Sequence, residues 1–344
     1  MDSTKITVTM IDAAVSRGLK DMEDDPKRTI RKLADLGKQF STGRFQPKIF
    51  EIIQNLLENE DSPYYDLLQY FLGHTDHENA KKFGINLGYY SWTYYARKLR
   101  ETAEKKGYAI PWCLNLAFDT DTEKTHSDSL TVYQLMEIIR QARLLGINTF
   151  TITLVGNNIP DNELFTIFDE FPECAFFFLL GDCQITVAQQ NKLKKSGNVL
   201  LLVNCSSEDA LATCDALNIS GNLYSIYYRY DDLDVMSLEQ RNFYDRLSEF
   251  PASMLFLIPK TIRTKSAGPI VKEIRMEQKC PYFIWDFRYD SMQIGKILCD
   301  EDILLSFDKT GRAHLLNCED MYILKKGVTL EDILSKTMPH IQTV

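Results

Sequence analysis

The hydrophobic and polar positions of this chain follow two patterns, and the change between them falls near residue 108. Before that point apolar residues recur every three or four positions, as after Asp25-Pro26 and in Asn86–Lys106, which predicts helices. After it come short strand-length runs, most of them continuously apolar, separated by segments of helix length. Such runs are typical of a parallel sheet that is covered on both faces. The expected strands are Ile110–Phe118, Thr149–Val155, Ala175–Leu180, Val199–Val203, Leu223–Tyr230, Ser253–Ile258 and Tyr282–Phe287.

The segments between the expected strands predict helices, and one of them has clear ends. Thr131 and Gln134 fit a capping box at the start of a helix that runs to Leu145, and Gly146 fits the left-handed residue after it. Repeated strand and helix units indicate an α/β protein with a partial or complete (β/α) TIM-like barrel. An open doubly wound sheet is the alternative.

Three parts are expected along the chain. Residues 1–108 form a helical N-terminal region, 109–290 form the barrel domain, and 291–344 form a C-terminal extension. The extension is expected to contain a β-hairpin and a final short helix, because Gly311 suits a turn between two apolar runs. The two hairpin strands are Ile303–Phe307 and Ala313–Cys318, and the helix begins near Thr329.

Charge and the N-terminal pattern narrow the class of protein. The 344 residues carry a formal net charge of −9, which argues against a nucleic-acid partner. The N-terminus has no basic segment followed by an apolar core, and no apolar run approaches the length of a membrane span. We therefore expect a cytoplasmic protein with no membrane partner, whose thiols stay reduced.

The eight cysteines raise the question of metal binding. A zinc or iron–sulfur site draws two or three ligands from one short loop. No two cysteines here have CxxC spacing, and the closest pairs are nine residues apart. Buried thiols are therefore expected rather than a metal site. The cysteines are Cys113, Cys174, Cys183, Cys205, Cys214, Cys280, Cys299 and Cys318.

Charged residues follow the expected strands, where parallel barrels collect their chemistry. The carboxylates there could hold Mg²⁺ or Mn²⁺, or could simply cap the following helices. A basic segment from Lys260 leads into an expected helix near Ile270 and could bind an anion or be a solvated loop. The ligand-binding candidates are Asp119, Asp182, Asp231, Asp286, Lys260 and Arg263.

Several segments resemble the radical S-adenosylmethionine family, in a bacterial and archaeal branch with a helical N-terminal region and a cysteine-bearing C-terminal extension. They are Asp61–Tyr65, Asn86–Tyr90, Ile110–Trp112, Ser129–Ile147 and Phe283–Asp290. The resemblance implies a barrel in which a CxxxCxxC loop holds a [4Fe–4S] cluster. The cluster in turn binds and cleaves S-adenosylmethionine.

The departures from this family fall where its chemistry should be. Between Trp112 and Ser129, where the family has three cysteines, this chain has only Cys113. The Gly-Gly-Glu-Pro strand end that binds the methionyl amine resembles Gly156-Asn157-Asn158 here, without its carboxylate. In the extension, Lys296 and Leu316 stand near the expected cluster cysteines. We therefore expect no cluster, no metal and no cofactor; S-adenosylmethionine binding without cleavage is the remaining alternative.

The leading hypothesis is a pseudoenzyme that binds an active homologue, a peptide or a small ligand. The alternative is a barrel enzyme that uses the mouth carboxylates, with or without Mg²⁺ or Mn²⁺, on an anionic or phosphorylated substrate. Three or more converging carboxylates favour the enzyme. A mouth plugged by Phe118, Leu154 and Leu180 favours the pseudoenzyme.

Overall fold

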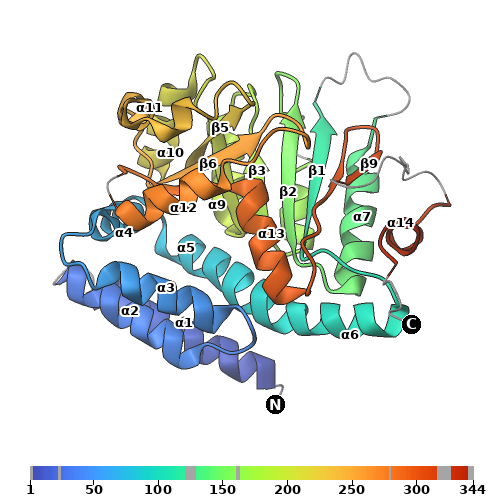
Figure 1. The fold of residues 1–344 in the computed structure, drawn as a ribbon, viewed down its shortest axis with the longest axis horizontal. Helices are drawn as coiled ribbons and strands as arrows, with labels where there is room; N and C mark the ends of the chain where they lie inside the picture. The colour runs from blue at the N-terminus through green and yellow to red at the C-terminus, as the bar shows by residue number, and fades with distance from the viewer. Residues whose placement is uncertain are drawn as a thin grey trace.

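The computed structural model describes residues 3–21, 25–120, 129–159, 163–278, 280–315 and 327–339. Helices come first, and strands then alternate with helices (Figure 1), as the change of pattern near residue 108 predicts. The helices before the first strand are α1 (Ser3–Asp21), α2 (Pro26–Phe40), α3 (Gln46–Leu57), α4 (Pro63–His74), α5 (His77–Ile85), the π-helix η1 (Asn86–Tyr95) and α6 (Ala96–Lys106).

The strands form a partial (β/α) barrel. Within the described residues they make one nine-stranded sheet in the order β7-β6-β5-β4-β3-β2-β1-β8-β9. Neighbours from β1 to β7 are parallel, β8 runs parallel to β1, and β8 and β9 form the expected antiparallel hairpin. The strands are β1 (Cys113–Asp119), β2 (Thr149–Val155), β3 (Ala175–Leu179), β4 (Val199–Asn204), β5 (Tyr224–Tyr230), β6 (Met254–Pro259), β7 (Phe283–Asp286), β8 (Leu305–Phe307) and β9 (Ala313–Leu315).

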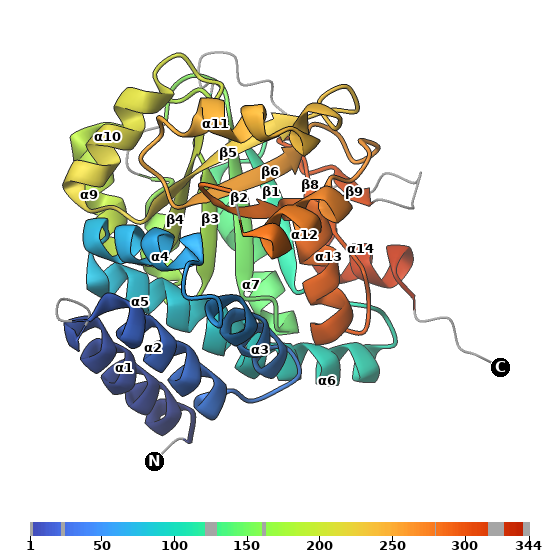
Figure 2. The same cartoon turned by 60° about the vertical axis from the view of Figure 1, so that its left-hand side comes forward.

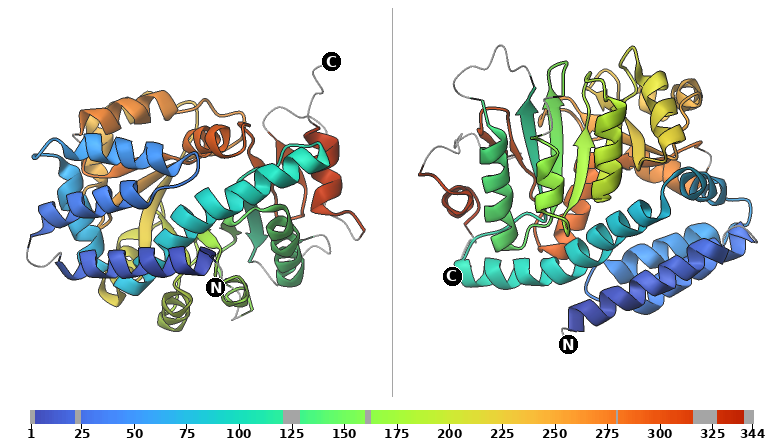
Figure 3. Two further views of the ribbon diagram at one scale, coloured as in Figure 1. Left: turned by 90° about the horizontal axis from the view of Figure 1, so that it is seen from below. Right: turned by 180° about the vertical axis from the view of Figure 1, so that it is seen from behind.

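Helices follow the strands and cover the outer face of the sheet (Figure 3). The predicted capping box is confirmed, because the Thr131 side chain accepts from the Gln134 backbone and Gly146 ends the helix with φ +101°. The remaining helices are α7 (Val132–Leu145), α8 (Thr166–Glu170), α9 (Val187–Ser196), α10 (Ala210–Ser220), the 3₁₀-helix η3 (Ser237–Glu239), α11 (Arg241–Leu247), α12 (Gly268–Glu277), α13 (Phe287–Leu298) and α14 (Leu330–Thr337).

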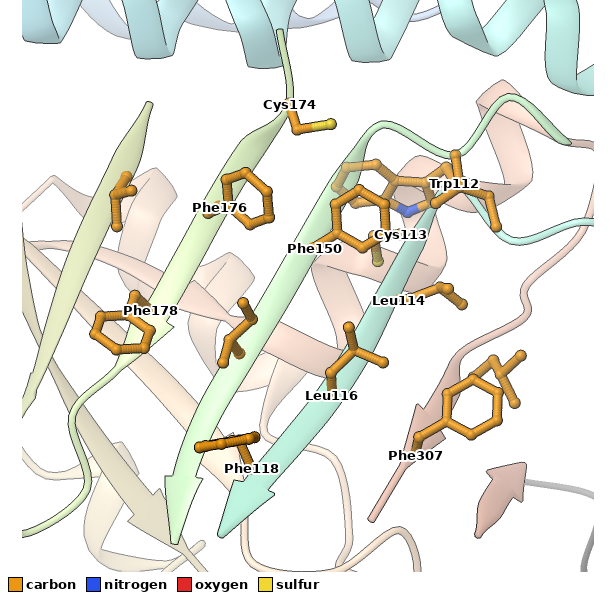
Figure 4. Packing of buried hydrophobic residues seen from close by; sticks show 14 of the residues in the cluster. Trp112, Cys113, Leu114, Leu116, Phe118, Phe150, Cys174, Phe176, Phe178 and Phe307 are labelled. Carbon is orange, nitrogen blue, oxygen red and sulfur yellow. The ribbon is translucent and has the colours of Figure 1, made fainter. Parts of the chain in front are cut away.

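The two faces of the sheet pack into two different hydrophobic cores. Successive side chains of a strand point to opposite faces. On β1, Leu114, Leu116 and Phe118 pack into the outer core (Figure 4). The apolar stripe of α7 belongs to the same core. The inner face has its own core, built from Phe177, Leu179, Leu202, Tyr227, Phe256 and Phe287. The space that this inner face encloses is called the lumen below.

The N-terminal helices close the amino end of the lumen. Phe83 of α5 belongs to the inner core, and its ring meets Phe177 of β3 edge to face with 5.6 Å between the centroids. Asn86, at the start of η1, donates from its amide to the carbonyls of Pro172 and Cys174, just before β3. The lumen therefore opens at the carboxyl end of the strands. No helix of the described residues has the length and apolar character that crossing a membrane requires.

Candidate functional site

A cavity of about 320 Å³ lies in the lumen, above the aromatic inner core. Its apolar floor includes Leu179, Ile258 and Phe287. The polar part of its wall comes from alternate positions of β1, β2 and β5, from the segment after β6, from the start of α13 and from the β8–β9 hairpin. These polar side chains are Asn115, Thr151, Thr153, Arg229, Lys260, Thr261, Arg288, Ser306, Asp308 and His314.

Two arginines give the cavity a positive wall. Arg229 is half-buried and lies beside the Tyr227 hydroxyl; burial raises the pKa of Tyr227, and Arg229 opposes that rise. Arg288 is 6% exposed and donates to the carbonyls of Ile262 and Thr264, which fixes the segment after β6 over the lumen. Among the described residues, neither arginine has a carboxylate within ion-pair distance.

The one acidic side chain that the described residues give to the cavity wall is already engaged. Asp308 accepts from His314 at 3.1 Å and from the Thr310 and Arg312 backbones. Burial opposes its ionisation, but these hydrogen bonds hold the pKa of Asp308 below its ordinary value. The cavity is therefore suited to an anionic group of a ligand.

Two buried polar atoms in the wall have no partner among the described residues. They are the side-chain oxygen of Asn115 and the hydroxyl of Thr151, on the neighbouring strands β1 and β2. Thr151 is only 3% exposed, and the Asn115 amide nitrogen is 3.4 Å from the Ser306 hydroxyl. An unpaired buried polar atom costs stability. A ligand that hydrogen-bonds to both atoms would remove that cost.

The four predicted carboxylates do not converge. Asp119 pairs with Lys309 at 2.8 Å, and Asp231 pairs with Lys260 at 2.7 Å, which lowers the pKa of Asp231. Asp182 accepts from Asn204 at 3.1 Å. In the described part of the chain, no three His, Cys, Asp or Glu side chains gather as metal ligands do.

Asp286 has a structural position at the start of α13. It is fully buried and accepts from the Tyr230 hydroxyl at 2.8 Å and from the Tyr289 backbone at 2.7 Å. Burial raises the pKa of Asp286, and these hydrogen bonds and the nearby Arg288 oppose the rise. The carboxylate thus caps α13, as the simpler interpretation of the strand-end acids expects.

The basic segment divides between two cavities. Lys260 lies at the rim of the lumen, where it also approaches Asp234 at 3.5 Å. Arg263 is exposed and lines a neighbouring cavity of about 460 Å³ between this segment and α13. Arg288 lines both cavities. Of the two predicted cations, Lys260 is therefore the one that the structure places at the lumen.

Phe118, Leu154 and Leu180 do not plug the mouth. All three belong to the outer core, so these residues do not form the plug that would favour the pseudoenzyme. The inner aromatic residues fill the lower lumen instead. Neither converging carboxylates nor this plug is therefore available to separate the two hypotheses.

The residues that resemble degenerate family positions lie at opposite ends of the sheet. Gly156, Asn157 and Asn158 follow β2 at the mouth; Gly156 has φ +124° and accepts from the Cys183 thiol at 3.2 Å. Cys113 instead begins β1, at the far end, where burial raises the pKa of its thiol to about 12. It therefore lies at the start of β1 rather than in the loop after it.

The remaining cysteines are scattered as well. Cys174 and Cys280 precede β3 and β7, whereas Cys183 and Cys205 follow β3 and β4. Cys299 follows α13 and lies near Cys113. Lys296 pairs with Asp302 at 3.1 Å. The predicted positions Leu316 and Cys318 lie outside the described residues.

Comparison with known proteins finds likeness only among solved structures. No protein-family model and no curated protein matches the chain. Crystal structures of SuiB from Streptococcus suis are similar to it. The structure bound to S-adenosylmethionine has a TM-score of 0.48 and 13% identity over 71% of this chain and 68% of that one. A second SuiB structure has a TM-score of 0.45 and 11% identity over 71% and 70%. The SuiB complex with precursor peptide SuiA has a TM-score of 0.44 and 11% identity, over 64% of this chain and 62% of that one.

The prediction of no cofactor is corrected by this comparison. The SuiB structure with the TM-score of 0.48 holds S-adenosylmethionine, the same molecule that gives its name to the family the sequence resembles. A cofactor-free chain is thus no longer the expectation. At these identities the likeness concerns the fold alone.

Proposed function

We propose that this chain is a ligand-binding protein, in which the lumen of a radical S-adenosylmethionine type of partial barrel holds a ligand without cleaving it. The observation that carries the proposal is the cavity of about 320 Å³, with Arg229 and Arg288 in its wall. The unpaired side-chain oxygens of Asn115 and Thr151 line the same cavity. An α-amino carboxylate suits this combination, because its carboxylate matches a guanidinium and its ammonium matches an amide oxygen.

S-adenosylmethionine is the first candidate ligand, since it carries an α-amino carboxylate and is present in one of the similar structures. In the family a glutamate at a strand end binds the amine. The segment of this chain that resembles that strand end has Asn157 and Asn158 and no glutamate. We propose that Asn115 supplies the acceptor instead. A peptide is the second candidate occupant, because another similar structure is a complex with a precursor peptide.

The residues do not fit the [4Fe–4S] cluster of the family, so no reductive cleavage is proposed. The segment 120–128 after β1 has no cysteine in the sequence. Cys113 lies at the other end of that strand, and the described thiols form no group of three. Anaerobic incubation with iron and sulfide, followed by measurement of bound iron, tests this directly. Four irons bound per chain would contradict the proposal.

Calorimetric titration with S-adenosylmethionine tests the lumen. We expect one binding site per chain and recovery of the intact molecule after incubation with a reductant. Arg229→Gln removes the charge that we assign to the carboxylate and should weaken binding by roughly 10- to 100-fold. Arg263→Gln is the matched control, because Arg263 lines the neighbouring cavity. Equal affinities for both variants would refute the assignment.

Thr151→Val separates binding from stability. The Thr151 hydroxyl has no partner among the described residues, so its replacement by a methyl group should leave the free energy of unfolding unchanged or raise it by about 1 kcal/mol. Ligand affinity should nevertheless fall. A variant that is less stable but binds normally would mean that the hydroxyl serves the fold.

The alternative, an enzyme that works through mouth carboxylates and a divalent cation, has less support. Each of the carboxylates Asp119, Asp182, Asp231 and Asp286 has a side-chain or backbone partner of its own. Titration with Mn²⁺ tests that alternative, and stoichiometric binding would favour it.

A further inference from the structure

A separate cavity lies among the N-terminal helices. Its volume is about 310 Å³, and residues of α1, α2, α5 and η1 form most of its wall. Helix α1 lies against α2 and α5, outside the barrel (Figure 2). The wall is largely apolar, with Val15 from α1, Leu36 and Phe40 from α2, and Ile85 from α5. The cavity is partly open to solvent, and its volume is typical of small-ligand sites.

Two glycines keep this cavity open. Gly84 and Gly88 both line it, one helical turn apart, and a Cβ built at either position meets no atom within 4 Å. Close packing therefore does not require glycine at these positions. Close packing does require glycine at position 37, because a Cβ added to Gly37 would lie 2.0 Å from the Phe50 ring. Glycine inside a helix is destabilising relative to alanine, so the two open positions maintain space at a cost in helix stability.

The backbone beside the cavity is also unusual. Gly88 belongs to the π-helix η1, a rare geometry that is frequent at functional sites. The Gln46 side chain, which also lines the cavity, donates to the Gly88 carbonyl at 2.6 Å. This contact satisfies a carbonyl of the widened turn, so the wall requires no polar group from a ligand at that point.

The charges at the cavity define the chemistry of the ligand. Lys81 is the charged side chain that the described residues contribute to the wall. Its ammonium pairs with Asp12 at 3.0 Å and with Glu78 at 2.8 Å, and it donates to the Ser16 hydroxyl at 3.0 Å. Two carboxylates thus face one ammonium, and the local charge is negative. A carboxylate or phosphate headgroup would be repelled. Both carboxylates already pair with Lys81, and the rest of the wall is largely apolar, so the site best suits an uncharged apolar molecule.

We propose that this cavity is a binding site for an uncharged hydrophobic ligand with a hydrocarbon-like chain. Transfer of an apolar molecule from water to an apolar wall is favourable. The site is distinct from the lumen, where the wall is polar and positive. It is independent of the function proposed for the lumen.

Titration with Nile red, an uncharged apolar fluorophore, tests the site, with decanol and decanoate as competitors. We expect saturable binding at one site, displacement by decanol and little displacement by decanoate. Gly88→Leu places a side chain in the open space and should weaken decanol binding by at least about tenfold. Gly73→Leu is the matched control, because Gly73 also has open space and does not line this cavity.

Both variants are expected to fold, and far-UV circular dichroism checks this. If Gly88→Leu does not fold, Gly84→Leu fills the same space from the neighbouring turn. Three results would each overturn the proposal: no saturable Nile red binding, equal displacement by decanoate and decanol, or a folded cavity-filling variant that binds as well as the Gly73→Leu control.

Discussion

The contact between Phe83 of α5 and Phe177 of β3 leads to a quantitative prediction about how the N-terminal helices close the barrel. Phe177 is 7% exposed, and its ring contacts Phe83, Phe256 and Phe287 at centroid distances of 5.6, 6.0 and 5.9 Å. Phe177→Ala should therefore lower the free energy of unfolding by about 3–5 kcal/mol. Phe83 has one of these ring contacts, so Phe83→Ala should cost about 3 kcal/mol.

The double variant isolates the contact. An edge-to-face pair is worth about 0.5–1.5 kcal/mol beyond its burial, so the double variant should lose less than the sum of the single variants by that amount. Urea denaturation, followed by far-UV circular dichroism and by tryptophan fluorescence, measures each free energy. A coupling energy of zero would refute the inference that α5 closes the lumen. So would a separate unfolding transition of the N-terminal helices.

Phe168 provides the control for this cycle. Its ring contacts Phe165, Phe176 and Phe178 on the outer face of the sheet, and it has no ring contact with Phe83 among the described residues. Phe83→Ala and Phe168→Ala should therefore be additive within about 0.5 kcal/mol. If the coupling energies in both cycles were similar in size, the coupling would reflect a general loss of packing rather than the contact between the Phe83 and Phe177 rings.

Three further predictions follow from single residues. Thr131→Ala removes the capping hydroxyl of α7 and should lower the free energy of unfolding by about 1 kcal/mol in urea denaturation. Burial raises the pKa of Asp290 from 3.8 to about 6. Its stabilising contribution is therefore complete below pH 4 and is lost as the pH rises through 6, which lowers the free energy of unfolding by roughly 3 kcal/mol. In Asp290→Asn the free energy of unfolding should depend less on pH between those values. The Cys113 thiol, with its pKa near 12, should resist iodoacetamide in the native protein, and mass spectrometry of the modified peptides measures this.

The spacing of apolar residues and the residues that begin or end helices and strands were sufficient to predict the elements of the barrel. Each of the seven expected strands is present, with ends that differ by a few residues, because a continuously apolar run between turn residues has few other stable arrangements. The hairpin and the capped helix after Thr131 were also predicted correctly. Helix α5 was not identified, because its nine residues are largely polar and its N-cap, Asp76, follows closely after α4.

The faces of the strands could not be predicted in the same way. When both faces of a strand are apolar, the sequence does not indicate which residues point inward. Phe118, Leu154 and Leu180, which were considered as a possible plug of the mouth, lie on the outer face. The lumen residues Asn115 and Thr151 were also missed. A signal for them exists in the sequence: each is a polar residue flanked by apolar ones within an expected strand. Because the candidate residues were sought at the ends of strands, these positions within strands were not identified.

The position of α13 explains how an incomplete barrel can still enclose the lumen cavity in which we propose that a ligand binds. Strands β7 and β9 are the two edges of the sheet, and α13 follows β7 directly. Its cap at Asp286 directs Phe287 into the floor of the cavity and Arg288 into its rim, where Arg288 fixes the segment from Lys260 to Thr264. One helix start therefore builds the floor and the rim together. Loss of the contacts at Asp286 should consequently lower ligand affinity in the lumen as well as stability, because the same hydrogen bonds that hold the helix also shape the site.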